Sequence, residues 1–401
     1  MADRMPFIIL AGVLAWAVSV NAAAQVEYID PGPGFTQVVT TTNDGVKTIF
    51  VSGQVGRGDT LREHAESAFG GVVRRLEQAG ATRSDVVKIR IFVKDFEPAQ
   101  YQTVADVRLA TFPEEHQWPA STMIGVRALA AESLRVEVEA IAVVAEPGVD
   151  LGIERFAPSN GFSGAVAVTA HGVKTVYVAG QIAAGDSLAE QTAAVWERVA
   201  QRLDAAGASL ADLVKATTYI VDFDPETDLA AYRAGRERAL ALDDMPASTL
   251  LGIPALAAEQ FLIEIDGIAV VGVEGNAVER EFIDPAAGFT QAVTARGTGP
   301  KVVQVSGQVG RPGDSLESQA GQVYANLRRR LEAAGAGPGD LLKVVIYMPE
   351  YARGDFAVID AAHQAHGFPE EPAPAATLLG IQSLFADGAL LEIEGIAVVE
   401  P

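Results

Sequence analysis

The chain has 401 residues, of which 49% are hydrophobic and 20% charged, proportions that exclude a disordered chain and suggest two or three domains. Its formal net charge of −22 disfavours nucleic acid and anionic membrane surfaces as partners, because both are bound largely through Lys and Arg. The absence of cysteine excludes disulfides, thiolate metal sites and cysteine nucleophiles.

The first 24 residues have the pattern of a signal peptide. Arg4 precedes an apolar run from Met5 to Val20, and small residues follow as far as Ala24. Cleavage after Ala24 would give a periplasmic or secreted protein with no membrane contact. The alternative is an uncleaved N-terminal anchor, although the run is slightly short for a membrane-spanning helix.

One sequence unit then occurs three times. Val51-Ser52-Gly53-Gln54-Val55 is repeated with its glycine at Gly180 and again at Gly307, each 127 residues further on. Pro-Ala-Ser-Thr at 119–122 and Glu-Val-Glu-Ala-Ile-Ala at 137–142 recur at nearly the same spacing. A unit of this length is too long for a solenoid repeat, so we expect each copy to have a hydrophobic core of its own. We expect three domains, at residues 25–147, 153–273 and 280–401.

The elements of the first copy can be read in chain order. Two strands, at 35–40 and 47–55, flank the hairpin turn Asn43-Asp44-Gly45. Asp59-Thr60 can cap a helix that ends at Gly80. A strand at 86–93, a helix at about 100–112 and strands at 121–126 and 134–144 follow. The order β-β-α-β-α-β-β predicts an α+β fold, a mixed sheet with two helices on one face.

These motifs resemble the YjgF/RidA family of reactive-intermediate (enamine/imine) deaminases. The resemblance extends over nearly the whole of each copy and implies a chorismate-mutase-like domain. Members of that family usually form homotrimers with ligand clefts between subunits. Three copies on one chain therefore predict an intramolecular pseudo-trimer, monomeric in solution, with clefts between repeats 1 and 2, 2 and 3, and 3 and 1.

The resemblance also assigns roles to residues. The glutamate that holds the attacking water falls on Glu137, Glu264 and Glu392. The substrate-binding positions fall on Phe35, Gly53, Ser121, Phe162, Gly180, Ser248, Phe289, Gly307 and Ala376. The family's carboxylate-binding arginine would stand where this chain has Ser121, Ser248 and Ala376, and Arg57 or Arg311 could replace it. Lys88, Lys215 and Lys343 recur in all three copies and are more typical of a structural role.

Each of these residues also has a structural interpretation. The three glutamates could be solvent-facing strand residues, the three phenylalanines core residues, and Gln54, Gln181 and Gln308 turn amides. His363 and His366 are interpreted as part of a solvated helix face rather than metal ligands, and no metal or other cofactor is expected.

Two functions remain open at this point. One is the hydrolysis of a small reactive imine or enamine by a glutamate-held water in the clefts. The other is a non-catalytic small-molecule-binding or scaffold protein that keeps the fold. Ribonuclease activity is the weakest hypothesis, because the chain is acidic and the copies share no histidine.

Overall fold

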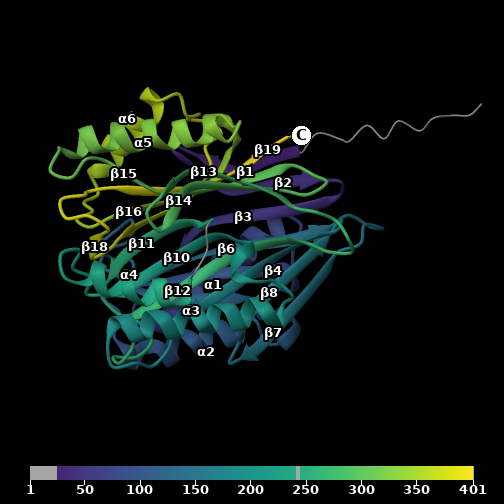
Figure 1. Ribbon diagram of the computed structural model, residues 1–401, viewed down its shortest axis with the longest axis horizontal. Helices are drawn as coiled ribbons and strands as arrows, with labels where there is room; N and C mark the ends of the chain where they lie inside the picture. The colour runs from purple at the N-terminus through teal and green to yellow at the C-terminus, as the bar shows by residue number, and fades with distance from the viewer. Residues whose placement is uncertain (1–24, 241–243, 401) are drawn as a thin grey trace, which may run out of the picture.

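A computed structural model describes residues 25–240 and 244–400 and contains three copies of one α+β unit (Figure 1). The segment interpreted as a signal peptide, residues 1–24, lies outside the described residues. Within the described part of the chain, no helix is both long enough and apolar enough to cross a membrane.

The elements of each copy follow the same order. Repeat 1 contains β1 (Gln25–Gly32), β2 (Phe35–Asn43), β3 (Val46–Val55), α1 (Leu61–Gln78), β4 (Val86–Lys94), α2 (Tyr101–Thr111), β5 (Ala120–Val126) and β6 (Val136–Ala145). Repeat 2 contains β7 (Gly152–Ser159), β8 (Phe162–Ala170), β9 (Val173–Gln181), α3 (Leu188–Ala205), β10 (Leu213–Val221), α4 (Asp228–Ala239), β11 (Ala247–Ile253) and β12 (Ile263–Gly272). Repeat 3 contains β13 (Glu279–Ala286), β14 (Phe289–Arg296), β15 (Lys301–Val309), α5 (Leu316–Ala333), β16 (Leu341–Met348), α6 (Asp355–Ala365), β17 (Ala375–Gly380), the short β18 (Ser383–Leu384) and β19 (Glu392–Val399).

The predicted order lacked the first strand of each copy. β1 pairs antiparallel with β2, from Gln25 opposite Thr42 to Gly32 opposite Phe35. It lies at the edge of its sheet and is mostly exposed or half-buried. The alternation of polar and apolar residues that marks a half-buried strand is therefore weak in this segment.

Each sheet is mixed, as predicted. In repeat 1 the strands lie in the order β1-β2-β3-β6-β4-β5, with β4 and β5 parallel and the other neighbours antiparallel. Repeats 2 and 3 have the same order.

The three sheets join edge to edge and close into one ring. The strand at one edge of each sheet meets the second strand of the next copy in parallel: β5 meets β8, β11 meets β14, and β17 returns to β2. At each join a backbone N–H donates to a proline carbonyl, for example Thr36 N to Pro374 O at 3.0 Å. The first repeat is thus hydrogen-bonded to the third; Thr36 Oγ1, for example, donates to the carbonyl of Ala373, 337 residues further along the chain.

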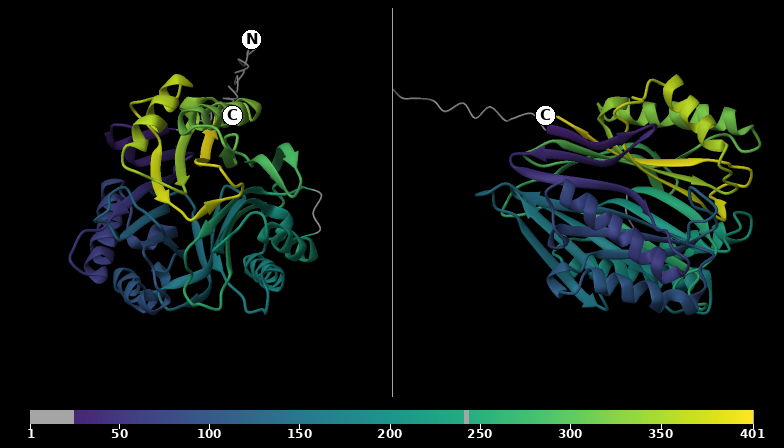
Figure 2. Two further views of the ribbon diagram at one scale, coloured as in Figure 1. Left: turned by 90° about the vertical axis from the view of Figure 1, so that its left-hand side faces the viewer. Right: turned by 180° about the vertical axis from the view of Figure 1, so that it is seen from behind.

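The helices cover the outer face of this ring (Figure 2). Thr60 caps α1 through the backbone N–H of Glu63, whose side chain bonds back to the Thr60 N–H, a capping box. Alternate residues on the strands behind α1, such as Val138 and Ala140, pack with Phe69 and Leu76 of the helix. Each repeat has its own core of this kind, and the inner faces of the sheets pack together in further clusters drawn from all three repeats.

Candidate functional site

Two clefts lie at joins between repeats and contain the predicted site residues. The cleft between repeats 3 and 1, the 3/1 cleft, has a volume of about 510 Å³. Repeat 1 lines it with Phe35, Gly53 and Glu137, and repeat 3 lines it with Ala376. The structure therefore brings together four of the predicted positions from opposite ends of the chain.

The cleft between repeats 2 and 3, the 2/3 cleft, is smaller, with a volume of about 190 Å³. Phe289, Gly307 and Glu392 of repeat 3 line one side of it, and Ser248 of repeat 2 lines the other. These are the repeat-related counterparts of the residues in the 3/1 cleft.

At the join between repeats 1 and 2, the 1/2 junction, an arginine lies among the predicted residues. The Arg108 guanidinium donates to Ser121 Oγ at 3.1 Å and lies 4.7 Å from the centre of the Phe162 ring. It is 2% exposed, and it lies close enough to Glu264 to lower the pKa of that carboxyl, a minor effect beside burial. A guanidinium on α2 thus reaches the serine that stands where the resemblance expects an arginine.

At each site a glycine leaves room for the side chain of the predicted catalytic glutamate to lie against the neighbouring strand. A Cβ built on Gly53 would lie 1.6 Å from Glu137 Oε1, and Gly180 and Gly307 stand in the same relation to Glu264 and Glu392. Any side chain at these positions would displace the carboxyl. Because glycine has no side chain, the space beside each strand is free for the carboxyl group.

The three glutamates are buried, so the interpretation as solvent-facing strand residues is wrong. Glu137, Glu264 and Glu392 are 4%, 5% and 3% exposed. Within the described residues, Oε2 of Glu137 and Oε2 of Glu392 are buried without a hydrogen-bond partner. A buried carboxyl oxygen with no partner is costly in a folded protein, and it is commonly found where a ligand or water completes the site.

Burial raises the pKa of each of these carboxyls to about 8. A second carboxylate two residues further along the same strand adds to the effect: Glu139, Asp266 and Glu394 respectively. At neutral pH each site therefore holds a protonated carboxyl that can donate a proton. Perturbed carboxyls of this kind are typical of functional sites.

The other predicted residues differ in where the structure places them. Nε2 of Gln54, Gln181 and Gln308 donates to a carbonyl of its own strand at 3.0 Å, as a turn amide would. Gln54 and Gln308 also line the 3/1 and 2/3 clefts. Arg57 lines the 3/1 cleft, whereas Arg311 is absent from the residues that line the 2/3 cleft. His363 is buried and stacks on Phe368 at 5.4 Å, so its assignment to a solvated face is wrong.

Sequence reasoning missed most of the cations at these sites. Arg108 lies on α2 at the 1/2 junction, Arg233 and Arg236 on α4 line the 2/3 cleft, and Arg353 lines the 3/1 cleft. Arg108 has Gly235 and His363 at the repeat-related positions. A search for residues shared by all copies therefore could not find it; the only available signal was an arginine on the half-buried face of a helix.

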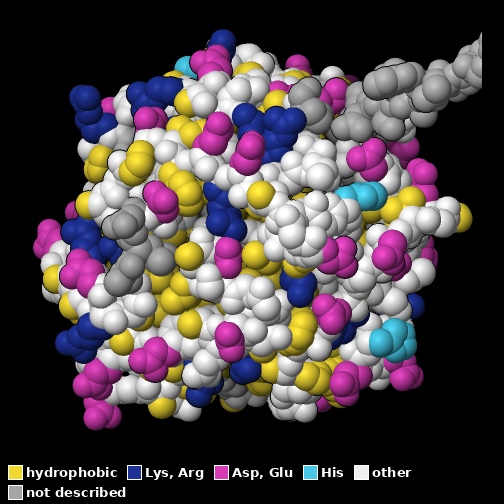
Figure 3. Space-filling model, turned by 45° about the vertical axis from the view of Figure 1, so that its right-hand side comes forward, with side chains coloured by type: hydrophobic (Ala, Val, Ile, Leu, Met, Phe, Trp, Pro, Cys, Tyr) yellow, Lys and Arg dark blue, Asp and Glu magenta, His cyan; other side chains and the backbone are white. Residues whose placement is uncertain are grey.

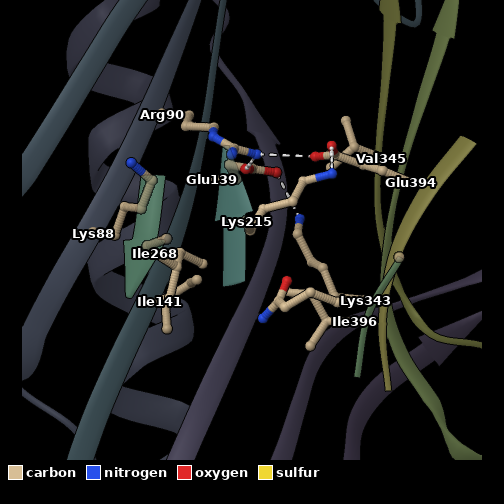
Figure 4. A pocket seen from close by; sticks show the side chains of 13 residues that line it. Lys88, Arg90, Glu139, Ile141, Lys215, Ile268, Lys343, Val345, Glu394 and Ile396 are labelled. Atoms are coloured by element: carbon tan, nitrogen blue, oxygen red, sulfur yellow. Dashed lines mark hydrogen bonds and ion pairs between the residues drawn. The ribbon is translucent and has the colours of Figure 1, made fainter. Parts of the chain in front are cut away.

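A separate ionic cluster lies where the inner faces of the three sheets meet (Figure 4). Each repeat's lysine pairs with the acid of another repeat: Lys88 with Asp266 at 3.2 Å, Lys215 with Glu394 at 2.8 Å, and Lys343 with Glu139 at 2.6 Å. These contacts support the structural role expected for the three lysines.

Arg90 has no equivalent in the other copies, which have Thr217 and Val345 at this position. It bonds to Asp266 through Nε at 3.1 Å and to Glu394 through Nη1 at 3.2 Å. Arg90 of repeat 1 therefore links acids of repeats 2 and 3 at the centre of the ring.

In the described part of the chain, no group of three or more His, Asp or Glu residues is arranged to hold a metal ion. On the face shown in Figure 3, Lys and Arg side chains are interspersed with Asp and Glu.

Comparison with known proteins gives consistent matches. The chain matches the family described as Endoribonuclease L-PSP over residues 28–144, 152–271 and 279–399. It is 32% identical over 121 residues to a 2-iminobutanoate/2-iminopropanoate deaminase from Dermatophagoides farinae, a match that covers 28% of this chain and 87% of the relative.

Solved structures with a similar chain include RidA from an Antarctic Psychrobacter, at 31% identity and a TM-score of 0.25, covering 29% of this chain and 93% of that one. A YjgF-family protein from Neisseria meningitidis is 23% identical with a TM-score of 0.27, covering 31% and 97%. A chorismatase is 16% identical with a TM-score of 0.49, covering 78% and 93%. The three tandem matches, which together span most of the chain, show that this protein belongs to the Endoribonuclease L-PSP family, the YjgF/RidA family, as its motifs predicted.

Proposed function

We propose that the protein hydrolyses small reactive imines or enamines at the joins between its repeats. The observation that carries this proposal is the buried, partnerless carboxyl of Glu137 in a cleft, with a pKa raised to about 8 by burial. Glu392 has the same properties in the 2/3 cleft. Membership of the family supports the same reaction class, since a relative is named for imine deamination.

The reaction requires little more than a dry cleft, a water and one proton donor. The protonated glutamate donates its proton to the imine nitrogen, and a water adds to the C=N carbon while giving a proton back to the carboxylate. The C–N bond of the resulting carbinolamine then breaks, which leaves a carbonyl compound and ammonia. An imine and one water are consumed in each turnover, and the glutamate ends in its starting form.

Substrate specificity would differ from that of relatives with an arginine on the strand. Ser121, Ser248 and Ala376 cannot form a bidentate pair with a carboxylate, and the available cations come from other elements. We expect substrates without a carboxylate, or with an anionic group placed differently, to be preferred. A net charge of −22 makes RNA an improbable substrate.

We further propose that one chain acts as a monomeric pseudo-trimer and is exported by its N-terminal segment. Covalent linkage of the repeats keeps each at an effective concentration of roughly millimolar relative to the others. Analytical ultracentrifugation should show a single chain, and an obligate trimer of chains would contradict the proposal. N-terminal sequencing of protein recovered from the periplasm or medium should start at Gln25.

The decisive experiment measures ammonia release from imines generated in situ, with and without a carboxylate, by the chain from Gln25 onward. Turnover should vanish when Glu137, Glu264 and Glu392 are all replaced by Gln. The matched control is Glu154→Gln, the same substitution at an exposed strand position, which should leave turnover unchanged. Absence of turnover above buffer on every imine would exclude the enzyme and favour a non-catalytic binding protein.

A further inference from the structure

A chamber lies inside the ring, separate from the clefts between the repeats. Strands of all three repeats line it, and its volume is about 220 Å³. A smaller cavity of about 40 Å³ adjoins it and reaches the ionic cluster. The two cavities share Ile141, Ile268, Ile396 and Gln304 in their walls, so they are adjacent and only these side chains separate the outer chamber from the inner cavity.

The outer chamber is mostly apolar. Phe50 and Tyr177 line it at repeat-related positions, and the third such position is Gln304. The chamber ends at the hairpin turns of the three repeats, where Asn43, His171 and Thr298 line it. Thr298 Oγ1 donates to the His171 carbonyl at 3.3 Å, so the turns of two repeats meet at this rim.

The three isoleucines form the boundary between the chamber and the charges. They occupy one repeat-related position on β6, β12 and β19, two residues beyond the acids of the ionic cluster. In Figure 4 Ile141 and Ile268 lie next to each other below the Arg90 and Glu139 groups, and Ile396 lies on the opposite side, beside Lys343. Apolar walls thus lead directly to buried cations.

The ionic cluster carries an excess of positive charge. Lys88, Lys215, Lys343 and Arg90 supply four cations, whereas the acids paired with them are three: Glu139, Asp266 and Glu394. All seven side chains are buried. Each of the four cations contacts at least one acid, but the cluster as a whole has one more cation than acids. Net charge is expensive to bury, so one further anion would balance the cluster.

We propose that this axial cavity binds a small monocarboxylate with an apolar body, its carboxylate in the inner cavity and its body in the outer chamber. The size agrees, because an apolar cavity of about 150 Å³ accommodates benzene. The inner cavity, at about 40 Å³, exceeds the 10–15 Å³ that a single water needs. The charge agrees as well, since one carboxylate balances the four cations against the three acids.

The asymmetry of the cluster is what makes the site specific to an anion. Without Arg90, three lysines would face three acids and no charge would remain to be balanced. The single arginine of repeat 1 therefore creates the excess, and the paired lysines hold the acids that position it. This site goes beyond the proposed hydrolysis and uses none of the residues of the clefts.

Benzoate and its neutral analogue benzyl alcohol are the probes, titrated into the full chain by calorimetry. We expect benzoate to bind with one site per chain and at least about tenfold more tightly than benzyl alcohol, since a hydrogen bond to a charged group adds this much. Gln304→Phe completes the aromatic triad of Phe50 and Tyr177 and fills part of the chamber. This substitution should lower the affinity for benzoate at least about tenfold while leaving imine turnover unchanged.

Thr48→Leu fills part of the chamber from another wall and should also lower the affinity for benzoate. Arg236→Ala removes a cation of the 2/3 cleft and is the control for a carboxylate bound there; it should leave benzoate affinity unchanged. Benzoate binding that survives both filling variants, or that is lost with Arg236, would overturn the proposal. So would equal affinities for benzoate and benzyl alcohol, or no binding of benzoate at millimolar concentration.

Discussion

Glu137 should lower the stability of the folded protein at neutral pH, because folding takes a carboxyl with an ordinary pKa of 4.5 to a site where burial raises its pKa to about 8. Between these two values the folded state binds the proton more tightly than the unfolded state, so stability falls as the pH rises. At pH 7 the penalty is on the order of 3 kcal/mol, from 1.36 kcal/mol per pKa unit. Glu137→Gln, which is neutral at every pH, should therefore stabilise the protein at pH 7 by up to this amount and have little effect at pH 4.

Urea unfolding of the wild type and of Glu137→Gln at pH 4, 5.5, 7 and 8 measures this difference. Glu139→Gln is the matched control on the same strand: Lys343 and Arg90 hold the pKa of Glu139 below its ordinary value, although burial alone would raise it. Its loss leaves Lys343 without its acid partner and should destabilise the protein at neutral pH by about 3–5 kcal/mol. A Glu137→Gln variant that is less stable than the wild type at pH 7, or whose advantage does not grow with pH, would refute the assignment of a protonated carboxyl.

Three further outcomes are expected from the same structure. Arg90→Met should destabilise the chain by about 1.5–3 kcal/mol in urea unfolding, because it removes the buried hydrogen bonds to Asp266 and Glu394, although each acid keeps its lysine partner. Burial alone would raise the pKa of Glu394, but Lys215 and Arg90 lower it to about 2, so this carboxylate stabilises the fold above pH 4.5 by about 3 kcal/mol and the contribution is lost as the pH falls towards 2. Glu394→Gln should therefore flatten the acid side of the stability profile. Arg108→Ala should cost about 1–3 kcal/mol, read from the urea midpoint, because it removes the donor to buried Ser121 Oγ.

The sequence was sufficient to predict most of the fold, because its signals were local and were repeated three times. The turn Asn43-Asp44-Gly45, the cap at Thr60 and the glycine at Gly80 bounded elements that the structure contains within a few residues of the predicted bounds. The repeat spacing identified Gly53 and Glu137 as positions present in all three copies, and the family resemblance, not the spacing, placed both in one site. The first strand was missed because an exposed edge strand lacks a strong burial pattern.

The chemistry of the site depended on contacts between repeats, which local patterns do not report. Glu137 and Glu139 have the same residue type, strand and face, yet one has a raised pKa and the other a lowered one. The difference arises because Glu139 meets a lysine 204 residues away and Glu137 meets no cation at hydrogen-bonding distance among the described residues. Arg108 escaped notice for a related reason, since the copies do not share it.

Joining the three repeats in one chain removes a constraint that an assembly of identical subunits cannot escape. In a homotrimer every substitution is made three times, and an arginine at the position of Arg90 would place three guanidinium groups together on the axis. Here Thr217 and Val345 occupy the other two positions, so one arginine can bond to acids of both neighbouring repeats without facing a copy of itself. The same freedom applies at the joins, where the 1/2 junction contains Arg108 and the 2/3 and 3/1 clefts have different volumes and different cations. Because each site can change without altering the other two, a tandem chain can keep one join for stability while another takes a different substrate.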